Sequence, residues 1–436
     1  MTARLLAVLC LASFVACGPT SRPDGGVDDG GADLDSGVDA GLPASADRSR
    51  DILTTSLQLD LASHQATAAI SVASSTGPGA SFEVGDLDIT SVTSAGSPLN
   101  YAIDGGWLDV GLGSAASTLT VSYAFRDHSN FDGWLATNDL TFLWPYFCGN
   151  LFPCHSAPSD GVRLSLAVTG VPAGKTAVYP TNIPGDAPSY MLAVAVGDYT
   201  YLQLGATDAG TEVGVYYLPG GLAAAQTGTH NLDRAFDWYE RTYGAYTFGP
   251  KVASVAASWG PGGYGGMEHH PFWHVASSSM SDQITHYHEA AHGWFGDGVR
   301  ILCWEDFVLS EGTVSYLAAR ALQAVEGRDV WATYTTELND AIAAGDTIAL
   351  PSTCNAIDLL HDPLWSDIPY MKGAFFYRAV EQQVGAAALD RAIAKFYRDH
   401  VGGAASMQQM LDTIHTETGF DPTALANGWL RSLGHP

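Results

Sequence analysis

Charged residues are scarce in this chain, and positively charged ones are the scarcest. Only 15% of the 436 residues are Asp, Glu, Lys or Arg, and 19 lysines and arginines face 46 aspartates and glutamates. The resulting formal charge of -27 would be repelled by a phosphate backbone, which argues against nucleic acid as a partner. Hydrophobic residues make up 46%, so the chain can bury a core, and its length favours two or three domains.

The apolar stretch at the N-terminus lacks the length of a membrane span. It covers residues 5–16 behind one positive charge, Arg4, and its small-residue end is typical of an export signal. The letters "FVAC" resemble a bacterial lipobox, which predicts a signal peptide at residues 1–17 and lipid on Cys17. Phe14 stands where an aliphatic residue is usual, so plain secretion is the alternative. We expect an exported bacterial protein, lipid-anchored at the outer membrane or cell surface, and otherwise periplasmic or secreted.

Large apolar side chains are rare between residues 18 and 50, where Gly, Asp, Ser and Pro dominate. Such a segment cannot bury enough surface to offset the entropy lost on ordering. We therefore expect a flexible acidic tether between the lipid and the folded part. A calcium site made from its aspartates is the alternative, but no loop has a defined ligand spacing.

Cysteine is also scarce, with six in the chain, of which two belong to the signal. An even number in the body of an exported protein suggests disulfides among Cys148, Cys154, Cys303 and Cys354. Three connectivities are possible. The short loop that Cys148 and Cys154 would close favours pairing Cys303 with Cys354, and neither pair has the tight spacing of a zinc knuckle.

The rest of the chain divides into a strand-like and a helix-like part, according to the spacing of its apolar residues. Residues 51–207 alternate apolar and polar between Gly, Pro, Asn and Asp, which predicts an antiparallel β domain with one solvated face. Its clearest strands lie at residues 55–62, 66–73, 117–125, 162–168 and 190–204. Residues 208–436 are mainly helical, with helices expected at 221–243, 283–295, 305–325, 370–384, 387–400, 406–418 and 422–433.

Two histidines and a glutamate stand together in "HEAAH". His288 and His292 are four residues apart, so on a helix they lie on one face and can bind the same metal. Ser281 or Asp282 is the expected N-cap of that helix. Glu289 can then reach a metal-bound water, as in the His-Glu-x-x-His motif of metalloproteases. The alternative is a helix whose histidines only pack or cap.

A third ligand is available on the next predicted helix. A catalytic zinc site needs three protein ligands and leaves one position open for water. Glu311 follows His292 after eighteen residues, 293–310, which is enough for a turn and a return. Two histidines and Glu311 would bind one zinc per chain; the alternative makes Glu311 a solvated helix residue.

These motifs resemble the aminopeptidase N family of gluzincin metallopeptidases, which includes leukotriene hydrolase. The family pattern matches His288, Glu289, His292 and Glu311 in residue type and spacing. The stretch "WEDFVLSEG" resembles the family's Trp-x-Asp-x-x-Leu-Asn-Glu-Gly, with Ser310 in place of the asparagine.

Two further segments carry the same resemblance. "PYMKGAFFYRAV" resembles the segment whose tyrosine assists catalysis, here Tyr370. Upstream, "GGMEH" resembles the Gly-x-Met-Glu-Asn motif of exopeptidases, with its residues at Gly265, Gly266, Met267, Glu268 and His269.

The resemblance implies an α+β multidomain fold. A saddle-like β domain would be followed by a thermolysin-like, mainly helical catalytic domain with a small sheet of its own. Many relatives add a C-terminal helical domain, which we expect to be absent because the chain ends at Pro436.

The resemblance also implies roles for the site residues. Glu289 would take a proton from a zinc-bound water, and Tyr370 would donate a hydrogen bond to the developing oxyanion. Glu268 would bind the free α-amine of a peptide and so restrict cleavage to its first residue. Gly265, Gly266 and Met267 would run along the substrate as an edge strand.

Two departures from the family pattern affect the amine site. His269 replaces the asparagine, and His270 and His274 follow; these histidines are expected to be hydrogen-bonded or at the surface, with a second metal as the alternative. The family's β domain also lends a glutamate or glutamine just before a Pro-Cys pair. Residues 141–153 contain neither, so one amine anchor is lost or comes from elsewhere.

The sequence therefore predicts an exported zinc metallopeptidase, an aminopeptidase acting on peptides. One alternative is a zinc peptidase with endopeptidase or altered exopeptidase specificity. Another, of a different class, is a peptide-binding surface lipoprotein with a decayed active site.

Overall fold

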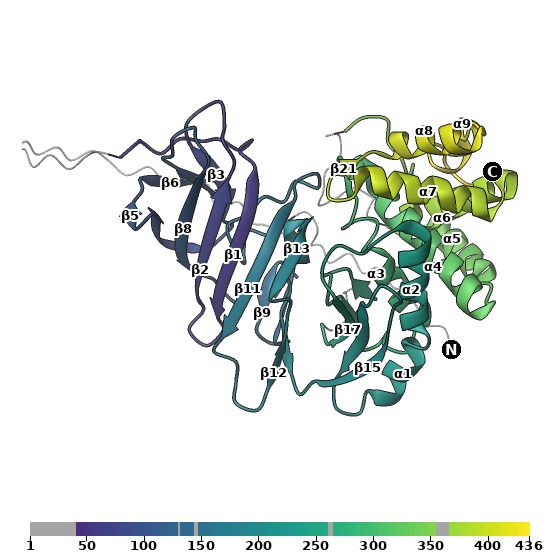
Figure 1. Cartoon of the computed structure of the whole chain (residues 1–436), viewed down its shortest axis with the longest axis horizontal. Coiled ribbons are helices and arrows are strands. Elements are labelled where there is room, and N and C mark those ends of the chain that lie inside the picture. Colours follow the sequence, from purple (N-terminus) through teal and green to yellow (C-terminus); the bar gives the residue numbers. More distant parts are fainter. Residues whose placement is uncertain (1–40, 130, 144–146, 260–264, 355–365) are drawn as a thin grey trace, which may run out of the picture.

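A computed structural model describes residues 41–436 apart from 130, 144–146, 260–264 and 355–365. The predicted signal peptide, Cys17 and residues 18–40 of the predicted tether lie outside the described residues. Among the helices that are described, none is long and apolar enough to cross a membrane. The chain forms two units, one of strands and one rich in helices, which lie side by side (Figure 1).

In its described residues, the N-terminal unit has three sheets. The largest has the order β13 (Asn182–Ala187), β11 (Val162–Thr169), β1 (Ile52–Asp60), β2 (Gln65–Val72), β8 (Ser117–Ala124), β4 (Asp88–Ser94) and β5 (Ser97–Pro98). A second has the order β12 (Thr176–Val178), β14 (Ala195–Gly197), β10 (Leu140–Phe142) and β9 (Gly133–Leu135). The third has the order β3 (Ala80–Glu83), β7 (Trp107–Val110) and β6 (Tyr101–Asp104).

Strand pairing in this unit is antiparallel, as expected, with one difference. Within the described strands, β1 and β11 pair in parallel, from Thr54 opposite Arg163 to Asp60 opposite Thr169. An alternating pattern reports which face of a strand is buried, as in β1, where Leu57 and Leu59 face the core. It does not report the direction of the neighbouring strand, so the parallel pair was not predictable from it.

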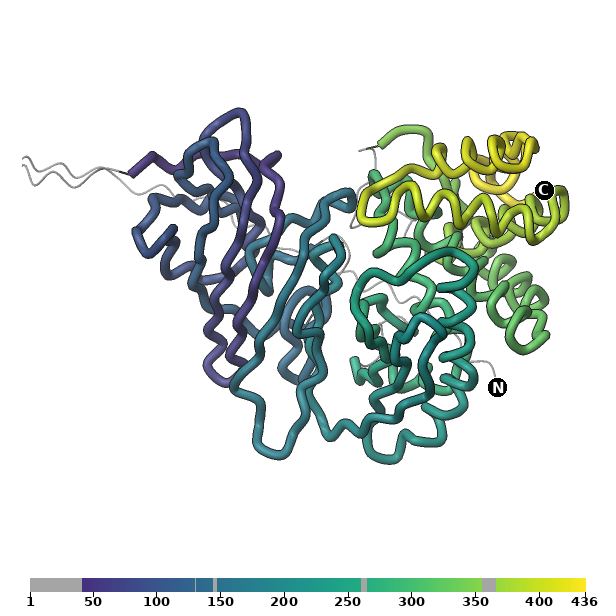
Figure 2. Tube along the Cα trace, in the orientation of Figure 1, coloured from purple at the N-terminus to yellow at the C-terminus, as the bar shows by residue number. Residues whose placement is uncertain are grey.

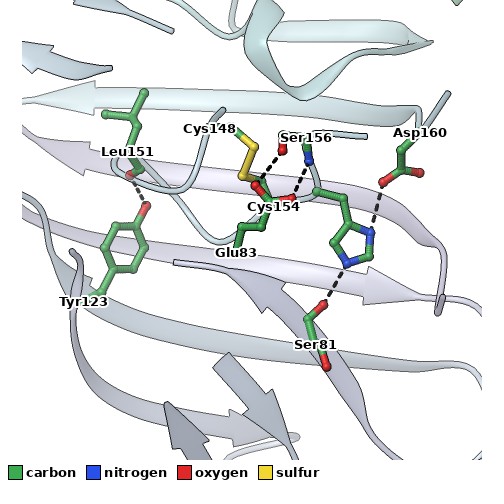
Figure 3. The surroundings of a disulfide bond; sticks show 9 residues. Ser81, Glu83, Tyr123, Cys148, Leu151, Cys154, Ser156 and Asp160 are labelled. Atoms are coloured by element: carbon green, nitrogen blue, oxygen red, sulfur yellow. Dashed lines mark hydrogen bonds and ion pairs between the residues drawn. A yellow bond between two sulfur atoms is a disulfide. The ribbon is translucent and has the colours of Figure 1, made fainter. Parts of the chain in front are cut away.

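A disulfide closes the loop before residue 155. Cys148 and Cys154 are bonded, and Glu83 accepts hydrogen bonds from the backbone and side chain of Ser156 just beyond (Figure 3). The second disulfide joins Cys303 to Cys354, so the structure has the pairing that loop length favoured.

The C-terminal unit begins with its own sheet. The order is β15 (Thr200–Ala206), β16 (Glu212–Tyr217), β17 (Lys251–Ala257), β19 (His274–Ala276) and β18 (Gly266–Met267). Residues 200–206, which the pattern assigned to the N-terminal β domain, therefore pair in the second unit's sheet. The strand-like pattern continues from one unit into the other without a break, which hides the boundary.

The sheet of the second unit is buried on both faces. In β17, Val252 and Ala256 pack in the core formed with the helices, whereas Val255 and Ala257 pack in the core of the N-terminal unit. A strand covered on both sides carries apolar residues at nearly every position, which explains the letters "VASVAA". The sheet therefore joins the two cores.

Helices make up most of the remainder, and their bounds lie close to the predicted ones. They are α1 (Leu222–Gly228), α2 (Leu232–Tyr243), α3 (Gln283–Ala291), α4 (Phe307–Glu326), α5 (Trp331–Gly345), α6 (Ile368–Val384), α7 (Ala386–His400), α8 (Met407–Thr418) and α9 (Thr423–Trp429). The segment 221–243 is two helices rather than one. Helix α5 was not predicted, because threonines, Asn339 and Asp340 weaken its helical pattern. The tube in Figure 2 shows α7 and α8 running beside each other.

One buried arginine connects the two units. Arg300 lies in β20 (Arg300–Ile301), which pairs with β21 (Ala404–Ala405). Its guanidinium donates to the carbonyls of Ser159 and Asp186 in the N-terminal unit, at 3.3 and 2.8 Å. A third bond reaches Gly402 O at 3.2 Å, and only 5% of the residue is exposed. Arg300 therefore holds β13 and the loop at Ser159 of the N-terminal unit against the second unit.

Arg300→Ala should lower the melting temperature by several degrees. Each lost bond to a charged donor contributes roughly 1.5–3 kcal/mol, and three carbonyls would lose their partner. Arg163→Ala is the matched control, because that side chain pairs with Asp186 at 3.5 Å but is 55% exposed. Differential scanning calorimetry would contradict the role of Arg300 if both variants melted alike.

Candidate active site

Helix α3 positions the two histidines of the predicted motif. It begins after Asp282, whose side chain accepts from the backbone N–H of Ile284 at 3.3 Å, as one of the two predicted caps. The helix ends at Ala291, earlier than predicted, and His292 is its C-cap with helical φ and ψ of -59° and -22°. His288 and His292 therefore remain on one face, with their Nε2 atoms 3.3 Å apart.

Helix α4 brings Glu311 to the same point. Its Oε2 lies 3.1 Å from His288 Nε2 and 3.4 Å from His292 Nε2. The adjacent His292 and His288 lower the pKa of the Glu311 carboxyl to about 2, although burial alone would raise it. The Glu311 carboxylate therefore presents an ionised oxygen to the two histidine nitrogens.

Neighbouring groups orient the histidines for metal binding. His292 Nδ1 lies 3.0 Å from the carbonyl of Phe295, which can only accept, so the ring proton belongs on Nδ1 and Nε2 offers a lone pair. His288 Nδ1 lies 3.4 Å from Ser315 Oγ. Two nitrogens and one oxygen that converge in this way fit Zn²⁺, which takes His and Glu ligands and leaves a fourth position open.

Glu289 lies between the metal-ligand group and the strand β18. The residue is 5% exposed, and burial raises the pKa of its carboxyl. A Cβ added to Gly266 would come within 2.3 Å of Glu289 Oε1. Gly266 is therefore required by the close approach of the strand to this carboxylate.

Tyr370 lies on α6 and contacts one of the two histidines. Its ring stacks on His288, with centroids 5.7 Å apart and an interplanar angle of 15°. Helices α4 and α6 approach closely here, because a Cβ on Gly312 would meet the Cα of Gly373 at 2.7 Å. These glycines follow Glu311 and Tyr370 closely in sequence, so the tight crossing brings both side chains to the site.

Glu268 directly follows β18 and lies beside Glu289 and His292. Carboxylate oxygens of Glu268 and Glu289 and a nitrogen of His292 lie within 4.8 Å of one another. Two residues that sequence reasoning missed are hydrogen-bonded here: the hydroxyl of Tyr190 lies 2.7 Å from Glu268 and 3.1 Å from Asp297. Asp297 lies five residues after His292, but the sequence pattern gave it no role. Tyr190 comes from the N-terminal unit, and no local sequence pattern marks it as a site residue.

The three nearby histidines are buried, and burial keeps them neutral. It lowers the pKa of His269 to about 4 and of His270 to about 3, and places that of His274 well below its usual value. His270 bonds Tyr246 and the carbonyl of Glu289, at 2.9 and 2.8 Å. No group of three potential metal ligands among the described residues includes these histidines, so the structure offers no second metal site there.

A cavity beside Glu268 is formed by both units. The N-terminal unit supplies Cys148, His155, Ser156, Ala157, Pro158, Pro188, Ser189 and Tyr190. The second unit supplies Glu268, Gly296, Ile301, Trp304, Phe307 and Ser310. A molecule bound at Glu268 would therefore contact both.

Comparisons with known proteins give matches among peptidases. Residues 272–429 match the family model for the Peptidase family M1 domain. Aminopeptidase M1-B of Oryza sativa is 25% identical over 320 residues, 65% of this chain and 36% of the relative. Leucine aminopeptidase 2 of Chaetomium globosum is 25% identical over 342 residues, 70% of this chain and 54% of the relative. The chain thus spans about a third to a half of the length of these relatives.

Solved structures share the fold. An M1 zinc metallopeptidase from Deinococcus radiodurans superposes with a TM-score of 0.75 at 18% identity, covering 89% of this chain and 96% of that one. Native LTA4 hydrolase from yeast gives a TM-score of 0.74 at 19% identity, covering 89% and 68%.

Fold and site together define a two-domain zinc metallopeptidase architecture. Residues 272–429 are similar to a Peptidase family M1 domain, and the described chain shares its fold with an M1 zinc metallopeptidase and with LTA4 hydrolase. The donor set of His288, His292 and Glu311 fits a Zn²⁺ ion.

Gly266→Ala should impair turnover far more than Gly265→Ala. The added Cβ at position 266 would displace the Glu289 carboxylate, whereas at position 265 its nearest neighbour is Ser279 Oγ at an ordinary 3.4 Å. Zinc content and melting temperature should be similar in both variants. Measured kcat values that fall equally would show that Glu289 and the strand are not closely coupled.

Proposed function

We propose that this protein is a zinc-dependent aminopeptidase that removes N-terminal residues from peptides. The observation that carries the proposal is Glu268, a buried carboxylate whose oxygen lies within 4.8 Å of Glu289 and His292. A negative group fixed this close to the metal ligands can hold the cationic amine of a peptide. The first peptide bond then lies at the metal and more distant bonds do not.

Three side chains would hold the zinc: His288, His292 and Glu311. When bound, zinc acts as a Lewis acid on the scissile carbonyl and lowers the pKa of a bound water to ~7. Glu289 takes the proton of the attacking water and transfers it to the leaving amine. The Glu289 carboxyl is supported in this role by its burial and its contact with the strand at Gly266.

Tyr370 stabilises the oxyanion in this mechanism. Its ring stacks on His288, which places Tyr370 beside the three proposed metal ligands. A preorganised donor of this kind is typically worth about 3 kcal/mol. The strand residues Gly265, Gly266 and Met267 would pair with the substrate backbone, since β18 is the edge of its sheet.

One observation favours a second candidate, a zinc peptidase of endopeptidase or altered exopeptidase specificity. Residues 141–153 supply no glutamate or glutamine to the amine site. With a single conventional anchor, selection for a free amine would be weaker. The decayed-binder alternative has less support, because the residues needed for metal binding, proton transfer and oxyanion stabilisation are all present.

The purified protein should contain about one zinc per chain. His292→Ala should lose most of it, because the Nε2 ligand is removed. Glu289→Gln should keep the zinc and lose ~10²–10⁴-fold in turnover, because the base is gone while the ligands remain. Metal analysis and peptidase assays on the same samples check both; near-normal activity of Glu289→Gln would refute the assigned role.

Glu268→Ala should cripple cleavage of aminoacyl fluorogenic amides. Losing one partner of a desolvated charge pair costs ~2–5 kcal/mol, and N-acetylated versions should be poor substrates of the wild type. Glu268→Gln, which keeps the shape and removes the charge, is the matched control and should also be impaired. Equal cleavage of free and acetylated substrates would favour the alternative peptidase.

A further inference from the structure

The N-terminal unit contributes one hydroxyl group to the carboxylates near the metal ligands. Tyr190 lies in the short 3-10 helix η1 (Ser189–Met191). Its hydroxyl oxygen is 2.7 Å from Glu268 Oε1 and 3.1 Å from Asp297 Oδ1. All three residues are buried, with 7%, 6% and 0% of their surface exposed.

This cluster has fewer donors than acceptors. A phenol has one proton, so Tyr190 can donate fully to Glu268 or to Asp297 but not to both. Asp297 Oδ2 has no hydrogen-bond partner within the described structure. A buried group that lacks its partner costs about 1–3 kcal/mol. A ligand that brings N–H donors and positive charge would complete the cluster.

Asp297 is fixed in place by a tight turn. Gly296 has a φ of +96°, and a Cβ there would meet His292 Nδ1 and Ser310 Oγ, each at 2.6 Å. The Asp297 N–H donates to His292 O at 3.3 Å. Because Asp297 is wholly buried, it can accept from Tyr190 but is shielded from a bound substrate.

We propose that Tyr190 is the second contact for the substrate amine, and that Asp297 is the acceptor that allows it. Without substrate, the tyrosine hydroxyl donates to Glu268. When the ammonium group binds, the hydroxyl turns to Asp297, which leaves the phenol oxygen and both Glu268 oxygens free to accept N–H bonds. The proposal rests on the proposed function, since the ligand is the amine of a peptide's first residue.

Each step of this exchange uses an acceptor that is already in place. The ammonium has three donors, and Glu268 can take two of them while Tyr190 takes the third. The hydroxyl moves between two oxygens that are both within hydrogen-bonding distance, so no backbone motion is needed. Tyr190 thus supplies from the N-terminal unit what residues 141–153 do not.

Binding to zinc-loaded protein in a Glu289→Gln background tests the contact without turnover. The probes are leucine amide and 4-methylpentanamide, which has the same skeleton without the amine. Measured by calorimetry, Tyr190→Phe should weaken the binding of leucine amide at least about tenfold and that of 4-methylpentanamide less than about twofold. Tyr199→Phe is the matched control, because it loses a bond to Ala256 O and does not contact Glu268.

The role of Asp297 as a positioning residue is tested by coupling. Asp297→Leu alone should weaken the binding of leucine amide. Combined with Tyr190→Phe, it should cause little further loss of affinity, because Asp297 acts through the Tyr190 hydroxyl. Asp297→Asn keeps an acceptor oxygen and should recover part of the amine selectivity. Fully additive losses, with no recovery by asparagine, would overturn this role.

The remaining outcomes separate this inference from the proposed function. A Tyr190→Phe variant that loses both probes equally, or neither, would overturn the amine contact. Amine-selective binding without hydrolysis of any peptide by the wild type would refute the proposed function and leave the contact standing. If the wild type cleaves free-amine peptides and Tyr190→Phe still binds leucine amide with full preference for the amine, the proposed function stands and the amine contact is refuted.

Discussion

The convergence of His288, His292 and Glu311 on one point is the interaction on which the site depends. The three ligand atoms lie 3.1–3.4 Å apart in a buried place, where one cation can bind all of them. The surrounding structure holds these side chains in place. The carbonyl of Phe295 orients the ring of His292, and Ser315 lies beside that of His288. Helices α4 and α6 are packed closely at Gly312 and Gly373, which fixes the position of Glu311 on α4. A zinc ion bound by all three side chains would hold the α3 segment against α4, so metal binding and local stability are linked.

The second constraint is that the amine end of the site is built from two units. Glu268 directly follows the strand β18, whereas Tyr190 comes from the N-terminal unit. Arg300 connects the same units a few residues beyond Asp297, through the carbonyls of Ser159 and Asp186 in the N-terminal unit. The proposed specificity therefore depends on domain packing as well as on the motif residues, since a small shift between the units would separate Tyr190 from Glu268.

Much of the site could be predicted because its chemistry lies in short segments. The spacing of His288, Glu289, His292 and Glu311 follows helix geometry, and the structure brings these side chains together. Glu268 and Tyr370 were found through the family resemblance. Tyr190 could not be found in this way, because its role arises from a contact with Glu268 across 78 residues of sequence. The parallel pairing of β1 with β11 and the sheet membership of β15 were missed for a similar reason, since neither is encoded in local alternation.

The most direct test of the account is the order in which products appear from an unblocked peptide. Zinc-loaded protein should release single residues from the N-terminus one after another, as followed by mass spectrometry over time, and leave the N-acetylated peptide intact. Early internal fragments, or equal digestion of the acetylated peptide, would contradict the claim that Glu268 positions a free amine beside the metal.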